Sequence, residues 1–345
     1  MEGTAQDLTI NFKQQITSSN IPNEIKEKLL NLLKFSGSQT GGWAEFEKTA
    51  SYIEFTLALP FGKVSNDILD LNRAKQILDR DHYGLQSVKD RVLEYLSVLI
   101  LHKQKGVGSS FHAPILAFIG LVGTGKTTIA YSIAESLGRP IFRIPFGGLG
   151  DPATLRGQSR IKVDAEAGQI MKAIKLAQVN NPVILLDEID RVSEEGKLDI
   201  MGVLIELLDP QQNHAFIDRY LDFSYDLSQV MFIATANNTG NISTAVLDRI
   251  EPIQMPSYSD EEKMVIGKKH LFPKALSEAG VDSSKINLDE SIWPMLIRPL
   301  GYDAGIRSLS RNLQGLARKV ARKIVEGNTG PFNINSQNLG EYLES

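Results

Sequence analysis

The 345-residue sequence contains no cysteine. This excludes disulfide bridges, thiolate zinc sites and a cysteine nucleophile, and it is typical of a reducing compartment. The five histidines are scattered without metal-ligand spacing, so we expect them at surface or packing positions. The first residues, MEGTAQDLTINF, lack the basic start and apolar core of a signal peptide, and no apolar run approaches membrane-spanning length. We expect a soluble cytoplasmic protein, with the mitochondrial matrix or another organelle lumen as the alternative.

The sequence also lacks an excess of positive charge. Its formal net charge is −4 and its pI is about 5.8, so no overall field attracts nucleic acid or an anionic membrane. Neither DNA nor a membrane is therefore an expected partner. Hydrophobic residues make up 42% of the chain, which is enough to build the cores of two or three packed units.

The order of the patterns indicates three regions, with boundaries at 1–63, 64–256 and 257–345. The first is predicted to be helical. In IPNEIKEKLLNLLKF the residues Ile25, Leu29, Leu32 and Leu33 share one face, and apolar residues recur at three- and four-residue steps from Trp43 to Leu57. The last region is predicted to be mostly helical. Its final long helix carries an apolar seam from Ile306 to Ile324 and a basic seam at Arg307, Arg311, Arg318 and Arg322, which we expect to be solvated except at Arg307.

The middle region alternates helical stretches with short, continuous apolar runs at 114–119, 140–144, 182–188 and 230–237. Such runs are typical of strands that are buried on both faces of a parallel sheet. The pattern predicts an α/β doubly wound core whose ligand site lies at the carboxyl ends of the strands.

The stretch GLVGTGKT (120–127) joins the first apolar run to a predicted helix and has the spacing G-x-x-x-x-G-K-[ST]. Glycines at these positions allow backbone N–H groups to surround a polyphosphate at the helix N-terminus, while Lys126 reaches the outer phosphates and the Thr127 hydroxyl ligates Mg²⁺. We predict a nucleotide as ligand and Mg²⁺ as cofactor. The expected nucleotide-binding residues of this stretch are Gly120, Leu121, Val122, Gly123, Thr124, Gly125, Lys126, Thr127 and Thr128.

Two further strand ends carry polar side chains. PVILLDE ends in Asp187 and Glu188, whose side chains point in opposite directions, so that one can hold the Mg²⁺ shell and the other can activate the attacking water. In FIATANN the apolar run is followed by Asn237, which is either a turn residue or an amide that faces the γ-phosphate. Arg249 and Arg307 are candidates for the positive charge that phosphoryl transfer requires, although an arginine at an arbitrary position is more often a surface residue or half of an ion pair.

In this order and spacing, GLVGTGKT, VILLDEID, FIATANN and LDRIEPI resemble the AAA+ ATPases. The segments 81–98, 207–237 and 301–313 are similar to the ATPase module of the Lon family of ATP-dependent proteases, and IEFTLALPFGK (53–63) resembles the turn that joins the Lon N-terminal region to this module. The likeness runs from about residue 22 to the C-terminus. It implies an AAA+ P-loop core, a helical lid and a preceding helical segment.

The resemblance also implies roles for individual residues. Lys126 and Thr127 match the phosphate and Mg²⁺ residues, Asp187 matches the acid of the metal shell, and Glu188 matches the water activator.

Five other residues match more peripheral parts of the family's site. Asn237 matches the first sensor, Arg307 the second sensor on the lid, and Arg249 the finger that enters the site of a neighbouring protomer. His82 and Tyr83 align with the segment that lines the adenine. A finger supplied by a neighbour implies a homo-oligomer, which in this family is a hexameric ring.

The sequence departs from the family pattern in three places. Lys162, followed by Val163, stands where the loop that grips substrate usually has an aromatic residue. Leu121 and Val122 replace two prolines that are common in the phosphate loop. The serine–lysine dyad of Lon proteases lies in a domain that would follow this module, and we find no motif for it, so we do not expect proteolysis by this chain alone.

The resemblance implies ATP hydrolysis that drives unfolding and translocation of unfolded or damaged proteins toward a Lon-type protease domain in the full-length protein. One alternative is a free-standing AAA+ remodelling factor without a dedicated protease, for which Lys162 is the main indication. Another is a nucleotide-switched binding protein without turnover, against which the set of Lys126, Glu188 and Arg249 argues. DNA binding is known in the Lon family, but the charge balance of this chain does not support it.

Overall fold

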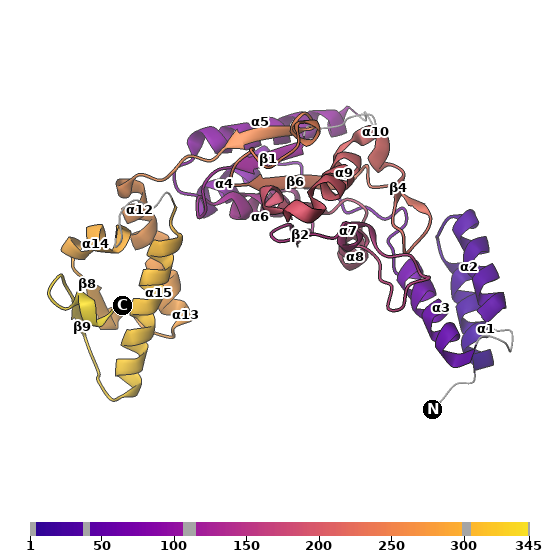
Figure 1. The fold of residues 1–345 in the computed structure, drawn as a ribbon. Helices are drawn as coiled ribbons and strands as arrows, with labels where there is room; N and C mark the ends of the chain where they lie inside the picture. The colour runs from indigo at the N-terminus through magenta and orange to yellow at the C-terminus, as the bar shows by residue number, and fades with distance from the viewer. Residues whose placement is uncertain (1–4, 37–41, 106–114, 299–304, 344–345) are drawn as a thin grey trace.

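The computed structural model describes residues 5–36, 42–105, 115–298 and 305–343. A group of N-terminal helices and a C-terminal helical lid lie at opposite ends of a central α/β unit (Figure 1). None of the helices in the described part of the chain combines the length and the apolar character needed to cross a bilayer.

The N-terminal helices are α1 (Ala5–Ser18), α2 (Asn23–Ser36) and α3 (Gly42–Leu57). The apolar faces predicted from their spacing are the faces that pack: Ile25, Leu29 and Leu33 of α2 and Ile53 of α3 are buried, while Leu32 is half-buried. These side chains belong to the same apolar cluster as one face of the central sheet. The side chain of Trp43, which was part of the predicted stripe, lies outside the described atoms.

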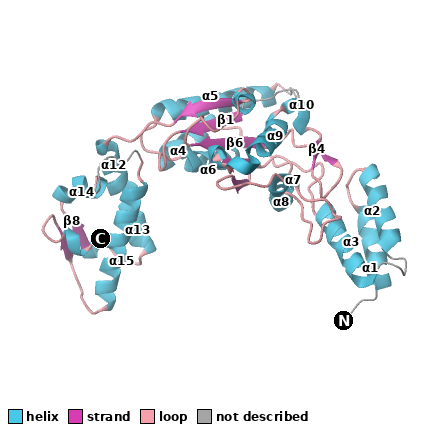
Figure 2. Ribbon diagram, in the orientation of Figure 1, coloured by secondary structure: helices cyan, strands magenta, loops and turns pink. Residues whose placement is uncertain are grey.

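The central sheet has five parallel strands within the described residues, in the order β2-β3-β6-β1-β7. Four of these strands confirm the predicted apolar runs, and β7 is an edge strand that the prediction missed. In Figure 2 the strands form a middle layer with helices on both sides. The strands are β1 (Ile115–Ile119), β2 (Ile141–Pro145), β3 (Val183–Asp187), β6 (Met231–Ala236) and β7 (Ile250–Gln254).

Alternation along the strands assigns side chains to the two faces of the sheet. Leu116 and Phe118 of β1 pack with α4 (Leu71–Asp81), α5 (Gln86–Gln104) and α6 (Lys126–Leu137). Ala117 and Ile119 pack in the cluster formed by α8 (Gln169–Ala177), α9 (Lys197–Leu208) and the N-terminal helices. Short elements complete the unit: α7 (Ala153–Arg156), α10 (Pro210–Asn213), β4 (Phe216–Ile217), β5 (Ser224–Tyr225) and α11 (Thr244–Leu247).

The lid has its own apolar core, built around Leu309, Leu313, Leu316 and Val320 of its last helix. Arg311, Arg318 and Arg322 on the opposite face are exposed, as the sequence predicted. The lid contains α12 (Asp260–Ile266), α13 (Phe272–Glu278), α14 (Trp293–Ile297) and α15 (Arg307–Val325), with two short parallel strands that were not predicted, β8 (Ile286–Leu288) and β9 (Phe332–Ile334). Residues 301–304 of the predicted GYDAGIRSL motif lie outside the described residues.

Candidate active site

Three of the predicted motifs meet at the carboxyl edge of the sheet. The register pairs Ile119 at the end of β1 with Ala236 of β6, and Leu186 of β3 with Ala234 of β6. Because the strands are parallel, the segments that follow them leave the sheet on the same side. The loop after β1, the acidic pair after β3 and Asn237 after β6 are therefore neighbours.

The phosphate loop, defined here as residues 120–127, is anchored by backbone contacts. The N–H of Gly120 donates to the carbonyl of Ala236 at 3.1 Å, which ties the start of the loop to β6. Gly123 and Gly125 have φ values of +83° and +95°, in the region that favours glycine. The buried Thr124 hydroxyl donates to the Leu121 carbonyl at 2.9 Å. Leu121 and Val122, in place of the family's prolines, are exposed on the outside of this turn.

Lys126 lies inside the turn and is nearly buried. Its ammonium nitrogen donates to the carbonyl oxygens of Gly120 at 2.6 Å and Leu121 at 3.0 Å, and to Oδ1 of Asn237 at 3.1 Å. Burial lowers the pKa of Lys126, while the carboxylates of Asp190 and Asp187 oppose that shift. The ammonium is thus held by neutral oxygens in a place where an anionic phosphate would be a stronger partner.

Asp187 lies beside Thr127, where a metal ion would bind. Its Oδ1 lies 3.3 Å from the Thr127 hydroxyl, and its Oδ2 accepts from Nε of Arg143 at 2.6 Å. A hydroxyl and a carboxylate are the hard oxygen donors that Mg²⁺ prefers, and Mg²⁺ usually takes one or two protein ligands and completes its shell with phosphates and water. In the described part of the chain no cluster of three His, Asp or Glu side chains could hold a metal by itself. The two donors here fit an Mg²⁺ whose other ligands would be phosphate and water.

Glu188 lies in a different environment from Asp187. It has a left-handed backbone, with φ +58°, and its N–H donates to the Thr235 hydroxyl at 2.9 Å. Its side chain is 33% exposed, with Oε2 3.7 Å from a guanidinium nitrogen of Arg191. One carboxylate is therefore enclosed beside a possible metal ligand, whereas the next is accessible to water.

Asn237 has one satisfied and one unsatisfied end. Its oxygen accepts from Lys126, and its Nδ2 is buried without a hydrogen-bond partner in the described atoms. A buried donor without an acceptor is costly, at about 1–3 kcal/mol. A phosphate oxygen or a water would supply the missing acceptor.

The lid approaches the phosphate loop at its glycines. The N–H of Ile306 donates to the Gly123 carbonyl at 3.1 Å, and a Cβ on Gly123 would lie 3.2 Å from the backbone nitrogen of Arg307. A Cβ on Gly305 would lie only 2.4 Å from the Val122 carbonyl oxygen. Arg307 is thus brought to the loop as the first residue of α15, with an exposed side chain.

His82 and Tyr83 follow α4, beside the base of the loop. The His82 ring is buried, and its Nε2 lies 3.0 Å from the Ser132 hydroxyl. Its Nδ1 is 4.0 Å from the position of a Cβ on Gly125. Tyr83 is 39% exposed, whereas the His82 ring packs against Ser132 of α6.

Arg249 is not at this edge. It directly precedes β7, whose first residue pairs with Ile115 at the start of β1. Five strand residues, at about 3.3 Å each, place it roughly 16 Å from the phosphate loop. Its Nη2 lies 3.0 Å from Oδ2 of Asp209, and its Nη1 donates to the Ala245 carbonyl at 2.7 Å. Arg249 therefore does not reach the site of its own subunit in this conformation.

Lys162 and Val163 occupy the tip of a loop, residues 157–168, at the end of the core that faces the N-terminal helices. Val163 is 76% exposed and the preceding Ile161 is 95% exposed. The base of the loop is fixed by the buried carboxylate of Asp218, which accepts from the N–H of Gly168 at 2.7 Å. The tip is thus exposed while its base is held.

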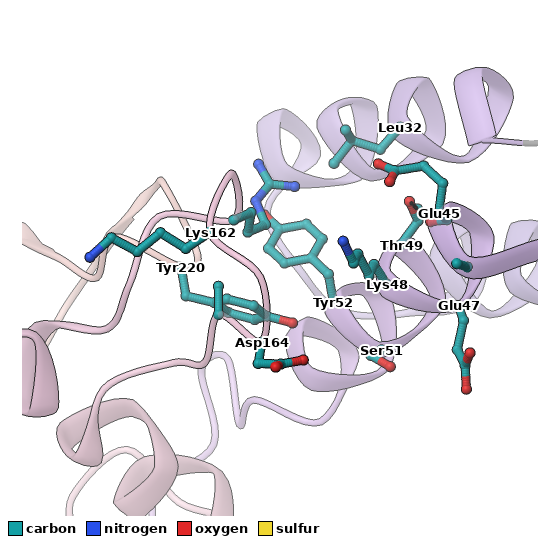
Figure 3. A pocket seen from close by; sticks show the side chains of 13 residues that line it. Leu32, Glu45, Glu47, Lys48, Thr49, Ser51, Tyr52, Lys162, Asp164 and Tyr220 are labelled. Atoms are coloured by element: carbon teal, nitrogen blue, oxygen red, sulfur yellow. Dashed lines mark hydrogen bonds between the residues drawn. The ribbon is translucent and has the colours of Figure 1, made fainter. Parts of the chain in front are cut away.

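A pocket of about 440 Å³ lies between this loop and α3. On its wall the guanidinium of Arg160 lies 4.1 Å from the ring centre of Tyr52, and the Tyr52 hydroxyl donates to the Leu221 carbonyl at 2.7 Å. Figure 3 shows Lys162 extending away from α3. The lining residues are Leu32, Ala44, Glu45, Glu47, Lys48, Thr49, Ser51, Tyr52, Arg160, Lys162, Asp164, Ala165 and Tyr220.

Sequence reasoning missed three residues of the site. Arg143 was a charged residue in the otherwise apolar run PIFRI, and Thr235 precedes Asn237 by two positions and so points to the same side of β6. The sequence shows that both are polar positions of predicted strands, but their contacts with Asp187 follow only from the strand order. Tyr258, whose hydroxyl lies 3.4 Å from the Thr124 carbonyl, had no signal beyond its place after the last strand.

Comparisons with known proteins agree with this geometry. A family model described as the ATPase family associated with various cellular activities (AAA) matches residues 116–258, and one described as the Lon protease AAA+ ATPase lid domain matches residues 277–332. The Lon protease of Lawsonia intracellularis is 40% identical over 329 residues, which is 95% of this chain and 39% of that protein.

Two other relatives give the same result. The Lon protease of Fusobacterium nucleatum is 40% identical over 98% of this chain and 43% of its own length. That of Endomicrobium trichonymphae is 45% identical over 85% of this chain and 36% of its own length. The chain thus spans about two fifths of the length of the curated relatives it matches.

Proposed function

The chain belongs to the Lon family as an AAA+ ATPase module, and on that premise we propose that it binds ATP with Mg²⁺ at the carboxyl edge of its sheet and hydrolyses it in a ring of identical subunits. One observation carries the proposal. Residues from three separate segments form two contacts: Lys126 Nζ lies 3.1 Å from Oδ1 of Asn237, and the Thr127 hydroxyl lies 3.3 Å from Oδ1 of Asp187.

The roles of these residues follow from their chemistry. The Lys126 ammonium would leave the loop carbonyls for the outer phosphates, which are stronger acceptors because they are charged. Thr127 and Asp187 would hold Mg²⁺, which neutralises charge on the phosphates. Glu188, which is open to water, would take the proton of the attacking water, and the free amide of Asn237 would orient that water or the γ-phosphate.

Two arginines would complete the site from outside the loop. Arg307 is already beside it at the start of α15. Arg249 lies at the far end of the sheet, which supports a role at the site of an adjacent subunit in a ring that we propose to be hexameric.

We propose further that turnover drives the unfolding and translocation of unfolded or damaged proteins toward a Lon-type protease domain of the full-length protein, in the cytoplasm. The names of the relatives support this, and so does the exposed tip of the loop at Lys162, which is free to contact a passing polypeptide.

The test is the variant Glu188→Gln. It should bind ATP as the original chain does, while steady-state hydrolysis falls by about 10²- to 10⁴-fold, because the base is lost and the shape is kept. Glu194→Gln is the matched control, because the Glu194 side chain is 77% exposed and pairs with Lys197 on the surface. Undiminished hydrolysis by Glu188→Gln would reject the assignment. No hydrolysis by the original chain after assembly would favour a nucleotide-switched binding protein.

A further inference from the structure

Thr235, on β6, contacts both members of the acidic pair. Its hydroxyl donates to Oδ1 of Asp187 at 2.5 Å and accepts the N–H of Glu188 at 2.9 Å. The side chain is fully buried. A hydroxyl has one proton to donate, and here the accepted N–H leaves that proton to Asp187. The hydrogen bond from the Glu188 N–H therefore orients the Thr235 hydroxyl so that its proton points to Asp187.

The sheet register explains this arrangement. Leu186 of β3 pairs with Ala234 of β6, so the next residues, Asp187 and Thr235, are side by side. Asn237 follows on the same side of β6 and contacts Lys126. The end of β6 thus contacts both halves of the site, with Thr235 on the acidic pair and Asn237 on the phosphate-loop lysine.

The two groups that Thr235 holds depend on it for orientation. Oδ1 of Asp187 is also the oxygen that faces the Thr127 hydroxyl, so the Thr235 bond sets the rotation of the carboxylate toward the metal position. Glu188 has φ +58°, which is unfavourable for a residue with a side chain, and its N–H would be left without its hydroxyl acceptor if Thr235 lost its oxygen.

We propose that Thr235 is a positioning residue that aims Asp187 at Mg²⁺ and holds the backbone of Glu188 in the conformation that directs its carboxylate to water. The inference rests on the proposed function, and it adds a residue that acts through the acidic pair without touching the nucleotide. It predicts that the Thr235 hydroxyl governs the contribution of Mg²⁺ to nucleotide affinity.

The experiment measures the affinity of the 345-residue chain for fluorescent ADP with and without Mg²⁺, so that no turnover is required. For Thr235→Val, which keeps the shape and loses the hydroxyl, affinity without Mg²⁺ should stay within about twofold, and the strengthening by Mg²⁺ should fall by about 10- to 100-fold. Thr235→Ser, which keeps the hydroxyl, should behave like the original chain. Steady-state hydrolysis should follow the same order.

The matched control is Thr56→Val, because Thr56 is equally buried and its hydroxyl bonds the Tyr52 carbonyl within α3, far along the chain from the site. It should leave the Mg²⁺ effect unchanged. A full Mg²⁺ effect in Thr235→Val, or an equal loss in Thr235→Ser, would overturn the proposal.

Two outcomes separate folding and function from the inference. If circular dichroism shows that Thr235→Val does not fold, Thr235→Cys decides, because a thiol of similar size is a weak donor and acceptor: a partial loss supports the proposal and a full Mg²⁺ effect overturns it. Failure of the original chain to bind ADP at all would instead overturn the proposed function.

Discussion

The ammonium nitrogen of Lys126 lies 3.1 Å from the side-chain oxygen of Asn237, and this contact joins the loop after β1 to the end of β6. The other end of the same amide, Nδ2, is buried without a partner in the described atoms. A single side chain therefore contacts the lysine of the phosphate loop and leaves a buried donor that a phosphate oxygen or a water would satisfy.

The first prediction concerns that amide. Asn237→Ala should bind ATP within a few-fold of the original affinity, because the loop and Lys126 remain. Hydrolysis should fall by about 10²- to 10³-fold, the usual cost of removing one positioned donor. Steady-state hydrolysis and fluorescent-nucleotide binding measure the two effects. The control is Asn238→Ala, at the next, exposed position, which should change neither ATP affinity nor hydrolysis. Equal hydrolysis rates in the two variants would show that Asn237 is only a turn residue.

The second prediction concerns Arg249. Because it lies at the far end of the sheet from its own phosphate loop, Arg249→Ala should abolish hydrolysis in a ring by removing a cation from the neighbour's site, with a loss of about 10³- to 10⁵-fold. An equal mixture with Glu188→Gln, itself inactive, should regain activity at about a quarter of its sites, where intact Glu188 meets an intact neighbouring Arg249.

The mixture distinguishes this role from a local one. Arg249 pairs with Asp209 within its own chain, so its loss could also disturb the fold. A mixture no more active than the sum of its parts would point to that structural effect. Thermal unfolding of Arg249→Ala provides the check, and Asp209→Asn tests the internal pair separately.

The third prediction concerns Lys162. Since the tip of its loop is exposed and the base is fixed by Asp218, Lys162→Ala should leave basal ATP hydrolysis unchanged. Stimulation of hydrolysis by an unfolded protein should weaken by roughly fivefold, equivalent to about 1 kcal/mol of contact energy. Lys75→Ala, at an exposed position of α4, is the control. If an unfolded protein stimulates hydrolysis equally in Lys162→Ala and Lys75→Ala, the Lys162 side chain does not contact the substrate.

The fourth prediction concerns stability and pH. Burial lowers the pKa of His82 from 6.5 to about 4, against the opposing effect of Asp81. Between these values the unfolded chain binds more protons than the folded one, so the contribution of His82 is complete above pH 6.5 and is lost as the pH falls toward 4. At pH 5 the loss should be about 2 kcal/mol.

Urea denaturation of the original chain and of His82→Gln at pH 7.5 and pH 5 measures this contribution. The variant should lack the part of the pH dependence that belongs to His82, because glutamine does not titrate in this range. An identical pH dependence in both proteins would show that the buried ring is not the group responsible.

Sequence patterns located the residues whose role can be recognised from their immediate neighbours in the chain. The glycine spacing, the acidic pair and the continuous apolar runs are each readable within ten residues. The edge strand β7 was missed because Glu251 and Pro252 interrupt it, and an edge position tolerates proline, which has no N–H to donate. A buried strand would not have tolerated it.

The missed part of the site depends on contacts across the sheet. Arg143 reaches Asp187 from the adjacent strand, and Thr235 reaches it from the other side. Neither neighbour can be identified until the strand order is known. The sequence predicted that Lys126 binds phosphate. It did not predict that the ammonium group of Lys126 donates to the carbonyl oxygens of Gly120 and Leu121 in this structure.

The contact between Ile306 and Gly123 has a mechanical consequence. At positions 123 and 305 the two backbones meet with no side chain between them, so a shift of the phosphate loop is passed to α15 without being absorbed by a change of rotamer. That helix has 19 residues and is about 28 Å long, so that a tilt of about 5° at its base moves its far end by roughly 2.4 Å. If ATP binds at this loop as proposed, a small tilt at the base of α15 would therefore become a larger displacement at the far end of the lid helix.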